Sequence, residues 1–306
     1  MLILPRNFID LDTFDPAELR SLVQCAKELK NNILSAKDSL AGKTLAMIFE
    51  KPSTRTRISF DVAMSKLGGR AVALSPSDLQ LGRGESLSDT AQVLSRYVDA
   101  IVLRTSRHNS LEELAAASSI PVINGLTDRT HPCQLLADIL TFEEHVGPIS
   151  GKKITWLGDG NNVAATWIQA AAQFNFDMQI GCPDSLRPQK KIVDWARSMG
   201  ATIEITEDPI AAVKGAHCVV TDTWVSLSDE QSKSIDLLKP FQVDSKKMEA
   251  AADGAIFMHC LPAKRGQEVT EEVLEGAASV IFDEAENRLH VQKAILLWCL
   301  APDGLF

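Results

Sequence analysis

Short runs of apolar residues alternate along the chain with longer stretches in which apolar residues recur at helical spacing. The short runs predict strands, and the longer stretches, such as Glu112–Ser118 and Ala164–Phe174, predict helices. Strands that alternate with helices favour parallel sheets covered by helices on both faces. Ten strands are predicted: Thr44–Phe49, Ala71–Leu74, Ala100–Leu103, Pro121–Ile123, Lys153–Leu157, Met178–Cys182, Thr202–Ile205, Cys218–Thr221, Ala255–His259 and Ser279–Phe282.

The length of 306 residues suits two domains better than one. Two glycines and a proline at Gly147–Gly151 follow the helical pattern Gln134–His145 and mark a boundary. We therefore expect an α/β protein with two doubly wound parallel-sheet domains, 1–147 and 148–284, joined by interdomain helices. The last helical stretch is Glu284–Leu300, and the C-terminal segment 285–306 is expected to pack back on the first domain.

Charge and cysteine usage narrow the choice of partners. Lys and Arg total 31 and Asp and Glu total 40, so the net charge of -9 disfavours nucleic acid and anionic membranes. Six scattered cysteines without a C-x-x-C pair, a start without a signal peptide and no apolar run of about 20 residues predict a reduced cytoplasmic protein. A small anionic substrate would then need arginines gathered in one pocket.

The segment Ser53–Arg57 reads Ser-Thr-Arg-Thr-Arg and joins the first predicted strand to a helix. Ser53 or Thr54 is expected to cap that helix, while backbone N–H groups, hydroxyls and Arg55 converge on one point. This pattern predicts a phosphate site. A plain capped helix with solvated arginines is the alternative, but capping explains only one of the hydroxyls.

Two further polar groups follow predicted strands, where ligands bind in open parallel sheets. Arg104 ends one strand and is either an anion ligand or a surface ion-pair partner. His131 and Gln134 flank Pro132 and Cys133 at a helix start, so both side chains can leave the same first turn. They could hydrogen-bond a carbonyl oxygen and an amino group, or the histidine could be incidental to a helix cap.

The segment Gly158–Val163 superficially resembles a dinucleotide-binding loop. Val163 replaces the third glycine of that motif, and no acidic residue ends the following strand, so a nicotinamide site is disfavoured. An asparagine pair at a helix start suits the polar head of an amino acid instead. Asp222, after another strand, could neutralise a substrate ammonium group, although capping a helix or turn is a common task for aspartate.

Cys260 stands at the mouth of an apolar strand, between His259 and a Leu-Pro turn. A buried cysteine is more often packing than chemistry. Neighbouring residues of a strand point to opposite sides, so His259 and Cys260 are not expected to form a nucleophilic pair. No C-x-x-C or H-x-x-x-H spacing exists, which disfavours a structural metal.

These clusters, in this order, resemble the carbamoyltransferase family over essentially the whole chain. Ser53–Arg57 matches the family's carbamoyl-phosphate motif, and His131–Gln134 matches its His-Pro-x-Gln motif. Gln80–Glu85 stands where aspartate-using members carry a catalytic lysine, and His259–Pro262 stands where they carry Pro-Leu-Pro. Asp222–Ser226 looks like the ornithine-binding loop, so the resemblance is to the ornithine-using branch.

The resemblance implies transfer of the carbamoyl group of carbamoyl phosphate to the side-chain amine of L-ornithine, giving L-citrulline and phosphate. It places the chain in arginine metabolism, with biosynthesis the expected direction, although one site serves both directions. It implies no metal, no organic cofactor and a homo-oligomer, usually a trimer. Catalytic roles are implied for three residues: Cys260, Arg104 and His131.

The binding residues implied by the resemblance fall into two sets. The carbamoyl-phosphate set comprises Ser53, Thr54, Arg55, Thr56, Gln80, Arg104, His131, Gln134, Cys260, Leu261 and Arg288, with Gln80 reaching a neighbouring subunit. The ornithine set comprises Asn162, Asp222, Ser226 and Leu227.

One departure from the family pattern concerns the residues after Ser226. The family usually has Ser-Met-Gly there, and this chain has Ser226-Leu227-Ser228. Leu227 keeps a backbone amide and much of the methionine volume, but loss of the glycine puts loop closure and acceptor preference in doubt. Another amine acceptor, such as acetylornithine or putrescine, and an inactive regulatory relative therefore stay open.

Overall fold

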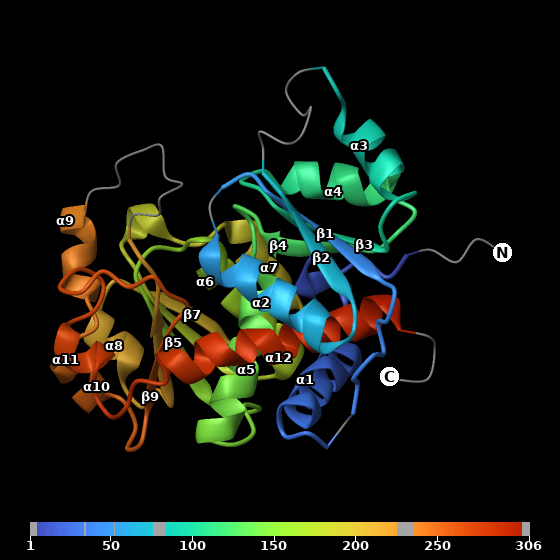
Figure 1. Ribbon diagram of the computed structural model, residues 1–306. Coiled ribbons are helices and arrows are strands. Elements are labelled where there is room, and N and C mark those ends of the chain that lie inside the picture. The colour runs from blue at the N-terminus through green and yellow to red at the C-terminus, as the bar shows by residue number, and fades with distance from the viewer. Residues whose placement is uncertain (1–4, 34, 52, 76–83, 225–234, 302–306) are drawn as a thin grey trace. The chain divides into compact units, whose positions relative to one another are not determined.

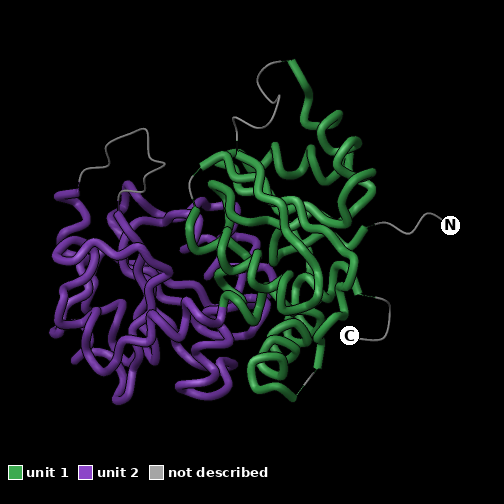
Figure 2. The backbone as a smooth tube through the Cα atoms, viewed as in Figure 1, with its two compact units in different colours: residues 1–136, 288–306 green, residues 137–287 purple. Residues whose placement is uncertain are grey.

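The protein, seen in a computed structural model, is described for residues 5–33, 35–51, 53–75, 84–224 and 235–301. Two compact units divide the chain (Figure 2): unit 1 contains Met1–Leu136 and Arg288–Phe306, and unit 2 contains Ala137–Asn287. The divisions fall inside two continuous helices, α5 (Pro132–His145) and α12 (Ile281–Leu300). The Gly147–Gly151 loop, where the sequence predicts a domain boundary, follows α5, and the division into domains 1–147 and 148–284 stays a prediction.

Unit 1 is built on a four-stranded parallel sheet with the order β2-β1-β3-β4 (Figure 1). Ile48, Leu103 and Val122 of the sheet form one buried core with Leu111 and Leu114 of the helix that follows β3. The elements of this unit before α5 are η1 (Leu11–Thr13), α1 (Pro16–Lys30), β1 (Thr44–Phe49), α2 (Thr54–Lys66), β2 (Arg70–Leu74), α3 (Leu87–Leu94), β3 (Ala100–Arg104), α4 (His108–Ala117) and β4 (Val122–Leu126).

Unit 2 is built on a five-stranded parallel sheet with the order β7-β6-β5-β8-β9. Leu157, Val219 and Phe257, from three adjacent strands, pack with Ala212 and Val213 in its core. Its elements between α5 and α12 are β5 (Lys153–Leu157), α6 (Asn162–Phe174), β6 (Asp177–Gly181), η2 (Asp184–Leu186), α7 (Lys190–Ser198), β7 (Ile203–Thr206), α8 (Pro209–Val213), β8 (Cys218–Thr221), α9 (Ile235–Leu238), η3 (Lys239–Phe241), α10 (Ser245–Ala250), β9 (Ile256–His259) and α11 (Glu271–Leu274).

Two doubly wound parallel-sheet domains were predicted, and the architecture confirms them. Nine of the ten predicted strands are present in the described residues within a few residues at each end. The tenth, Ser279–Phe282, is wrong: Ser279 makes a single bridge to Phe257, and Ile281 begins α12. A four-residue apolar run has too little length to separate a strand from the first turn of a helix.

The strand registers bring particular polar residues to the carboxyl edges of the sheets. Phe49 pairs with Arg104 in unit 1, so the segment that leaves β1 starts beside that arginine. Thr221 pairs with His259 in unit 2, so the residues that leave β8 and β9 start side by side. Within the ranges given above, no helix has the length and apolar character needed to cross a lipid bilayer.

Candidate active site

The first part of the site is the amino end of α2. Ser53 is the N-cap residue and has extended backbone geometry, but its side chain makes no capping hydrogen bond. The first backbone bond of the helix runs from the N–H of Arg57 to the carbonyl of Ser53, at 3.2 Å. The expected capping by Ser53 or Thr54 is therefore not formed through the Ser53 hydroxyl, which leaves the helix start suited to an anion.

Thr56 joins α2 to two arginines from distant parts of unit 1. Its hydroxyl is buried and accepts hydrogen bonds from Nη2 of Arg288, at 2.6 Å, and from Nη1 of Arg104, at 3.4 Å. Arg104 is the last residue of β3, and Arg288 lies on α12. Two guanidinium groups are thus fixed at the first turn of α2, where the helix dipole already favours negative charge.

His131 lies within the field of three arginines. Its side chain is 3% exposed, and burial together with the guanidinium groups of Arg288, Arg104 and Arg55 lowers the pKa of His131 well below its usual value. The imidazole is therefore neutral at neutral pH, and the positive charge of this region is carried by the arginines. A neutral imidazole among cations can donate a hydrogen bond to a carbonyl oxygen without adding charge.

The segment that carries His131 is tied to β4 on both sides. The side-chain amide of Asn124 donates to the hydroxyl of Thr130 at 3.4 Å, and the thiol of Cys133 donates to the carbonyl of Asn124 at 3.3 Å. Gln134 is fully buried, and its backbone N–H donates to the carbonyl of His131 at 3.1 Å. In the predicted His-Pro-x-Gln pattern, His131 therefore directly precedes α5, and Gln134 lies on the first turn of that helix.

The glycines of the segment that begins at Gly158 serve the protein's own backbone. A Cβ on Gly160 would lie 2.1 Å from the nitrogen of Pro188, so only glycine fits. Asn161 caps α6: its Oδ1 accepts from the N–H groups of Val163 and Ala164 at 2.9 and 3.0 Å. The close contact with Pro188 explains the glycine at position 160 without a pyrophosphate.

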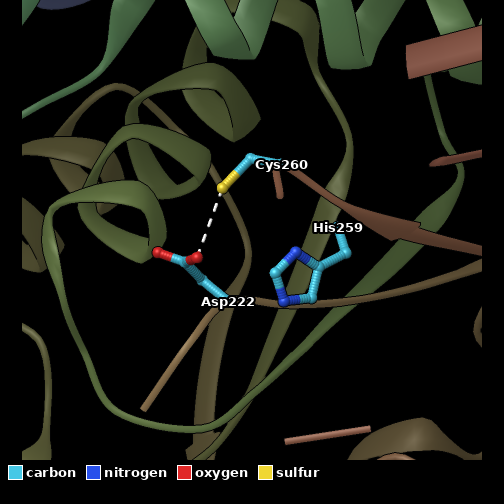
Figure 3. A group of neighbouring side chains, drawn as sticks. All are labelled: Asp222, His259 and Cys260. Carbon is cyan, nitrogen blue, oxygen red and sulfur yellow. Dashed lines mark hydrogen bonds between the residues drawn. The ribbon is translucent and has the colours of Figure 1, made fainter. Parts of the chain in front are cut away.

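The paired ends of β8 and β9 place Asp222 beside Cys260. The thiol of Cys260 points at the carboxylate of Asp222 (Figure 3) and donates to its Oδ1 at 3.3 Å. The same oxygen accepts the N–H of Thr223 at 2.7 Å, and Oδ2 accepts from the amide of Asn161 at 3.2 Å. Three donors therefore fix the orientation of this carboxylate.

Cys260 is held as a thiol rather than a thiolate. Burial, followed by the carboxylates of Asp222, Glu284 and Asp138, raises the pKa of the Cys260 thiol well above its ordinary value. Removing the proton would place a second negative charge beside Asp222 in a poorly solvated position. The thiol acts here as a hydrogen-bond donor, and the carboxylate is the acceptor of the pair.

His259 supports the turn instead of activating the thiol. Its Nε2 pairs with the fully buried Glu268 at 3.2 Å, and its Nδ1 accepts the N–H of Leu261 at 2.9 Å. These partners require the tautomer with the proton on Nε2. Leu261 has a φ of 56°, a conformation that costs energy for a residue with a side chain and is held by this bond.

Metal-ligand geometry occurs once among the described residues. Ligand atoms of Asp222, His259 and Cys260 all lie within 4.8 Å of one another. Both ring nitrogens of His259 have protein partners, and the Cys260 thiol keeps its proton. A cation at this position would have to compete with that proton.

The predicted site residues divide into three groups. In unit 1, Arg104, Thr56, His131 and Arg288 are brought together, Gln134 lies on the turn after His131, and Ser53 is half-buried while Thr54 and Arg55 are exposed at the α2 start. In unit 2, Asp222 and Cys260 are in contact, with Asn162 and Leu261 half-buried at adjacent turns. Gln80, Ser226 and Leu227 lie outside the described residues.

The sequence assigned the asparagine pair to the amino-acid head, but the ornithine set included Asn162 and not Asn161. Asn161 is the residue that contacts Asp222, and it does so from the N-cap position of α6. Asparagine is among the residues most favoured at N-caps, so the start of the helical pattern was the available signal.

Family models match both units. The model described as aspartate/ornithine carbamoyltransferase, carbamoyl-P binding domain, matches residues 6–144, and the model described as aspartate/ornithine carbamoyltransferase, Asp/Orn binding domain, matches residues 150–299. A relative from Nitrobacter winogradskyi named ornithine carbamoyltransferase is 54% identical over 304 residues, which cover 98% of this chain and 99% of the relative. A relative of the same name from Brucella suis is 54% identical over 303 residues, 98% of this chain and 97% of its own.

Solved structures agree with these matches. The ornithine carbamoyltransferase from Pyrococcus furiosus has a TM-score of 0.92 and 44% identity, with 98% of each chain covered. The anabolic ornithine carbamoyltransferase from Campylobacter jejuni has a TM-score of 0.90 and 42% identity, covering 96% of this chain and 98% of its own. With matched models over most of its length and relatives above half identity, this chain belongs to the aspartate/ornithine carbamoyltransferase family.

Proposed function

We propose that this chain transfers the carbamoyl group of carbamoyl phosphate to the side-chain amine of L-ornithine, giving L-citrulline and phosphate. The observation that carries the proposal is the gathering of Arg55, Arg104 and Arg288 around a neutral His131 at the α2 start. An acidic chain of net charge -9 has no general use for such a concentration of positive charge. A dianionic acyl phosphate explains it.

Unit 1 is proposed as the carbamoyl-phosphate half. The free first turn of α2, with Ser53, Thr54 and Arg55, binds the phosphate oxygens together with Arg104 and Arg288. Thr56, whose hydroxyl receives both guanidinium groups, keeps them aimed at that point. His131 and Gln134 hydrogen-bond the carbamoyl group, and the neutral imidazole donates to its carbonyl oxygen.

Unit 2 is proposed as the ornithine half. The carboxylate of Asp222, already oriented by three donors, receives the ammonium group of ornithine. Asn162, at the first turn of α6, and Ser226 with Leu227 position the amino-acid head and chain. Cys260 and Leu261, on the turn held by His259, contact the reactants at the same edge of the sheet.

The reaction is an acyl transfer by direct attack. A side-chain amine with a pKa of about 10.4 is mostly protonated at neutral pH and must lose a proton first. Because the Cys260 thiol retains its own proton, Asp222 is the group of the pair that can take up this one. The amine nitrogen then bonds to the carbamoyl carbon, and negative charge builds on the carbonyl oxygen beside Arg104 and His131. As the carbonyl re-forms, the carbon–oxygen bond to phosphate breaks, and the leaving phosphate takes up the second proton of the nitrogen.

The direct test uses purified protein with carbamoyl phosphate and L-ornithine. We expect citrulline and phosphate to appear in equal amounts. An inactive regulatory relative would bind carbamoyl phosphate without forming either product, and that result would overturn the proposal.

Acceptor identity is tested separately, because Leu227-Ser228 departs from the family's Met-Gly. Carbamoylated products are measured over a panel of aspartate, putrescine, acetylornithine and ornithine. Ornithine is expected to give the highest kcat/KM. A fluorescence titration with NAD is expected to show no binding.

We also propose a homo-oligomer, most simply a trimer, located in the cytoplasm. The trimer is what the family resemblance implies, because the residue that corresponds to Gln80 in the family reaches the site of a neighbouring subunit. Six cysteines that are all free thiols support a reducing compartment. Light scattering of the purified protein tests the trimer, since a monomeric mass would contradict it.

A further inference from the structure

The side-chain amide of Asn161 makes hydrogen bonds through both its oxygen and its nitrogen, and the two sets of bonds serve different purposes. Its Oδ1 accepts the backbone N–H groups of Val163 and Ala164, at 2.9 and 3.0 Å, and so caps α6. Its Nδ2 donates to Oδ2 of Asp222 at 3.2 Å. The two residues lie 61 positions apart, so this bond ties the β5–α6 turn to the end of β8.

The orientation of this amide is not free. Only an oxygen can accept two N–H groups, so Oδ1 must face the helix. The amino group must then face away from the helix, where Asp222 receives it. The helix cap therefore sets the direction of the donor without any further contact.

From this geometry we infer that Asn161 is a positioning residue for the acceptor: the α6 cap orients its amide so that Asp222 presents a fixed carboxylate to the substrate ammonium group. The inference rests on the proposed function and adds to it a residue that does not itself need to touch ornithine. It makes the first turn of α6 part of the machinery that selects a cationic acceptor.

The surroundings of Asp222 explain why one more neutral donor matters. The Cys260 thiol faces Asp222 from the residue after β9, and His259 lies within the same group of ligand atoms. Glu284 of α12 and Asp138 of α5 raise the pKa of the thiol. These neighbours of Asp222 are acidic or neutral, so none of them supplies a positive charge to the carboxylate. A donor without charge holds the carboxylate in place and leaves its charge for the substrate.

Substitutions at Asn161 can separate the cap from the positioning role. Serine and aspartate cap helices about as well as asparagine. Asn161→Ser keeps an oxygen for the helix and removes the donor to Asp222. Asn161→Asp also keeps the cap, but it places a second carboxylate against Asp222. Asn161→Ala removes both functions and is expected to lower the melting temperature as well.

The expected kinetic result is specific to the acceptor. Asn161→Ser and Asn161→Asp should retain melting temperatures near wild type and a near-normal KM for carbamoyl phosphate, while kcat/KM for ornithine falls about tenfold or more. In Asn161→Asp the acidic limb of the ornithine pH profile should move to higher pH, because two adjacent carboxylates hold a proton more tightly than one. Wild-type ornithine kinetics in both variants would overturn the inference.

A matched control comes from the next capped helix. Asp208 caps α8 by accepting from the N–H groups of Ile210 and Ala211, with the same geometry as Asn161. Asp208→Asn replaces an aspartate N-cap by asparagine, the opposite of Asn161→Asp, and it does so at a helix that is not assigned to the site. It should leave both the stability and the ornithine pH profile unchanged.

A readout without ornithine keeps this inference separate from the proposed function. The hydrogen bond to Asp222 contributes to the raised pKa of Cys260, so a carboxylate that turns away should speed alkylation of that thiol. We expect faster iodoacetamide labelling of Cys260, mapped by mass spectrometry, in Asn161→Ser than in wild type. Equal labelling rates would count against the inference, whereas an inactive wild type with the expected labelling would count only against the proposed function.

Discussion

The Cys260 thiol donates a hydrogen bond to Oδ1 of Asp222 across 3.3 Å, from the residue after β9 to the residue after β8. The direction of this bond decides the chemistry of the pair. A thiol whose pKa is raised by burial and by three carboxylates is not a base at neutral pH. Within the pair, the carboxylate is therefore the group that we propose takes up the proton of the substrate amine.

Replacing Cys260 should affect the acceptor more than the donor substrate. In Cys260→Ala, Asp222 loses one of its three donors, so we expect the ornithine KM to rise while the carbamoyl-phosphate KM stays near wild type. Cys260→Ser retains a donor and should be milder. Steady-state kinetics with each substrate varied in turn make the comparison, and equal damage to both would assign the thiol a structural role.

Arg55 should be needed for the donor substrate. It is exposed at the α2 start and contributes to the positive field at His131. Arg55→Ala is expected to raise the carbamoyl-phosphate KM and reduce turnover about a hundredfold or more. Lys66→Ala, which removes a charge at the other end of the same helix, is the control and should change little. Near-normal kinetics for Arg55→Ala would remove this residue from the phosphate site.

Replacing Thr56 by an apolar residue of the same shape should lower both the stability of the protein and its affinity for carbamoyl phosphate. Its buried hydroxyl is the acceptor for both Arg104 and Arg288. Thr56→Val leaves these guanidinium groups without that acceptor, at a cost of about 1–3 kcal/mol in the free energy of unfolding, and it should weaken carbamoyl-phosphate binding. Thr56→Ser keeps the hydroxyl and should recover most of both losses. Urea unfolding and isothermal titration measure the two effects, and a valine variant equal to the serine variant would contradict this role.

His131 should make the protein less stable as the pH falls. Its pKa is lowered in the folded state, so below about 6.5 the unfolded chain binds a proton that the folded protein does not. Stability from this source is complete above that pH and is lost as the pH falls towards the lowered folded pKa. His131→Gln should show a shallower fall of unfolding free energy between pH 7 and 5. Some dependence should remain through His108, whose pKa is lowered by burial and by Arg129.

The alternation of apolar runs was sufficient to predict both sheets, because a parallel strand buried on both faces leaves an uninterrupted apolar signature. β1, β5 and β8 begin and end at the predicted residues. The mistaken strand at Ser279–Phe282 fails for a local reason, since a single bridge to Phe257 precedes the helix that Ile281 begins. Periodicity cannot place that transition.

The site was less accessible to sequence reasoning. Spacing suggested an anion site at Ser53–Arg57, but not that Arg104 and Arg288 would share one hydroxyl of Thr56, because that requires the tertiary fold. Similarly, Gly160 is required by a backbone 28 residues ahead at Pro188, a contact that no local motif encodes. Candidate site residues could be chosen from their spacing along the chain. Which of these residues contact one another depends on the strand register and could be seen only in the structure.

The hydrogen bond between Arg288 and Thr56 joins positions 232 residues apart, and unit 1 is completed by the segment that begins at Arg288. A ribosome makes Thr56 early and Arg288 almost last. The strands of the unit 1 sheet are therefore synthesised long before the segment of α12 that completes this unit. Unit 2 is contiguous and ends at Asn287, one residue before Arg288, so the two units receive their last residues from the same helix, one directly after the other.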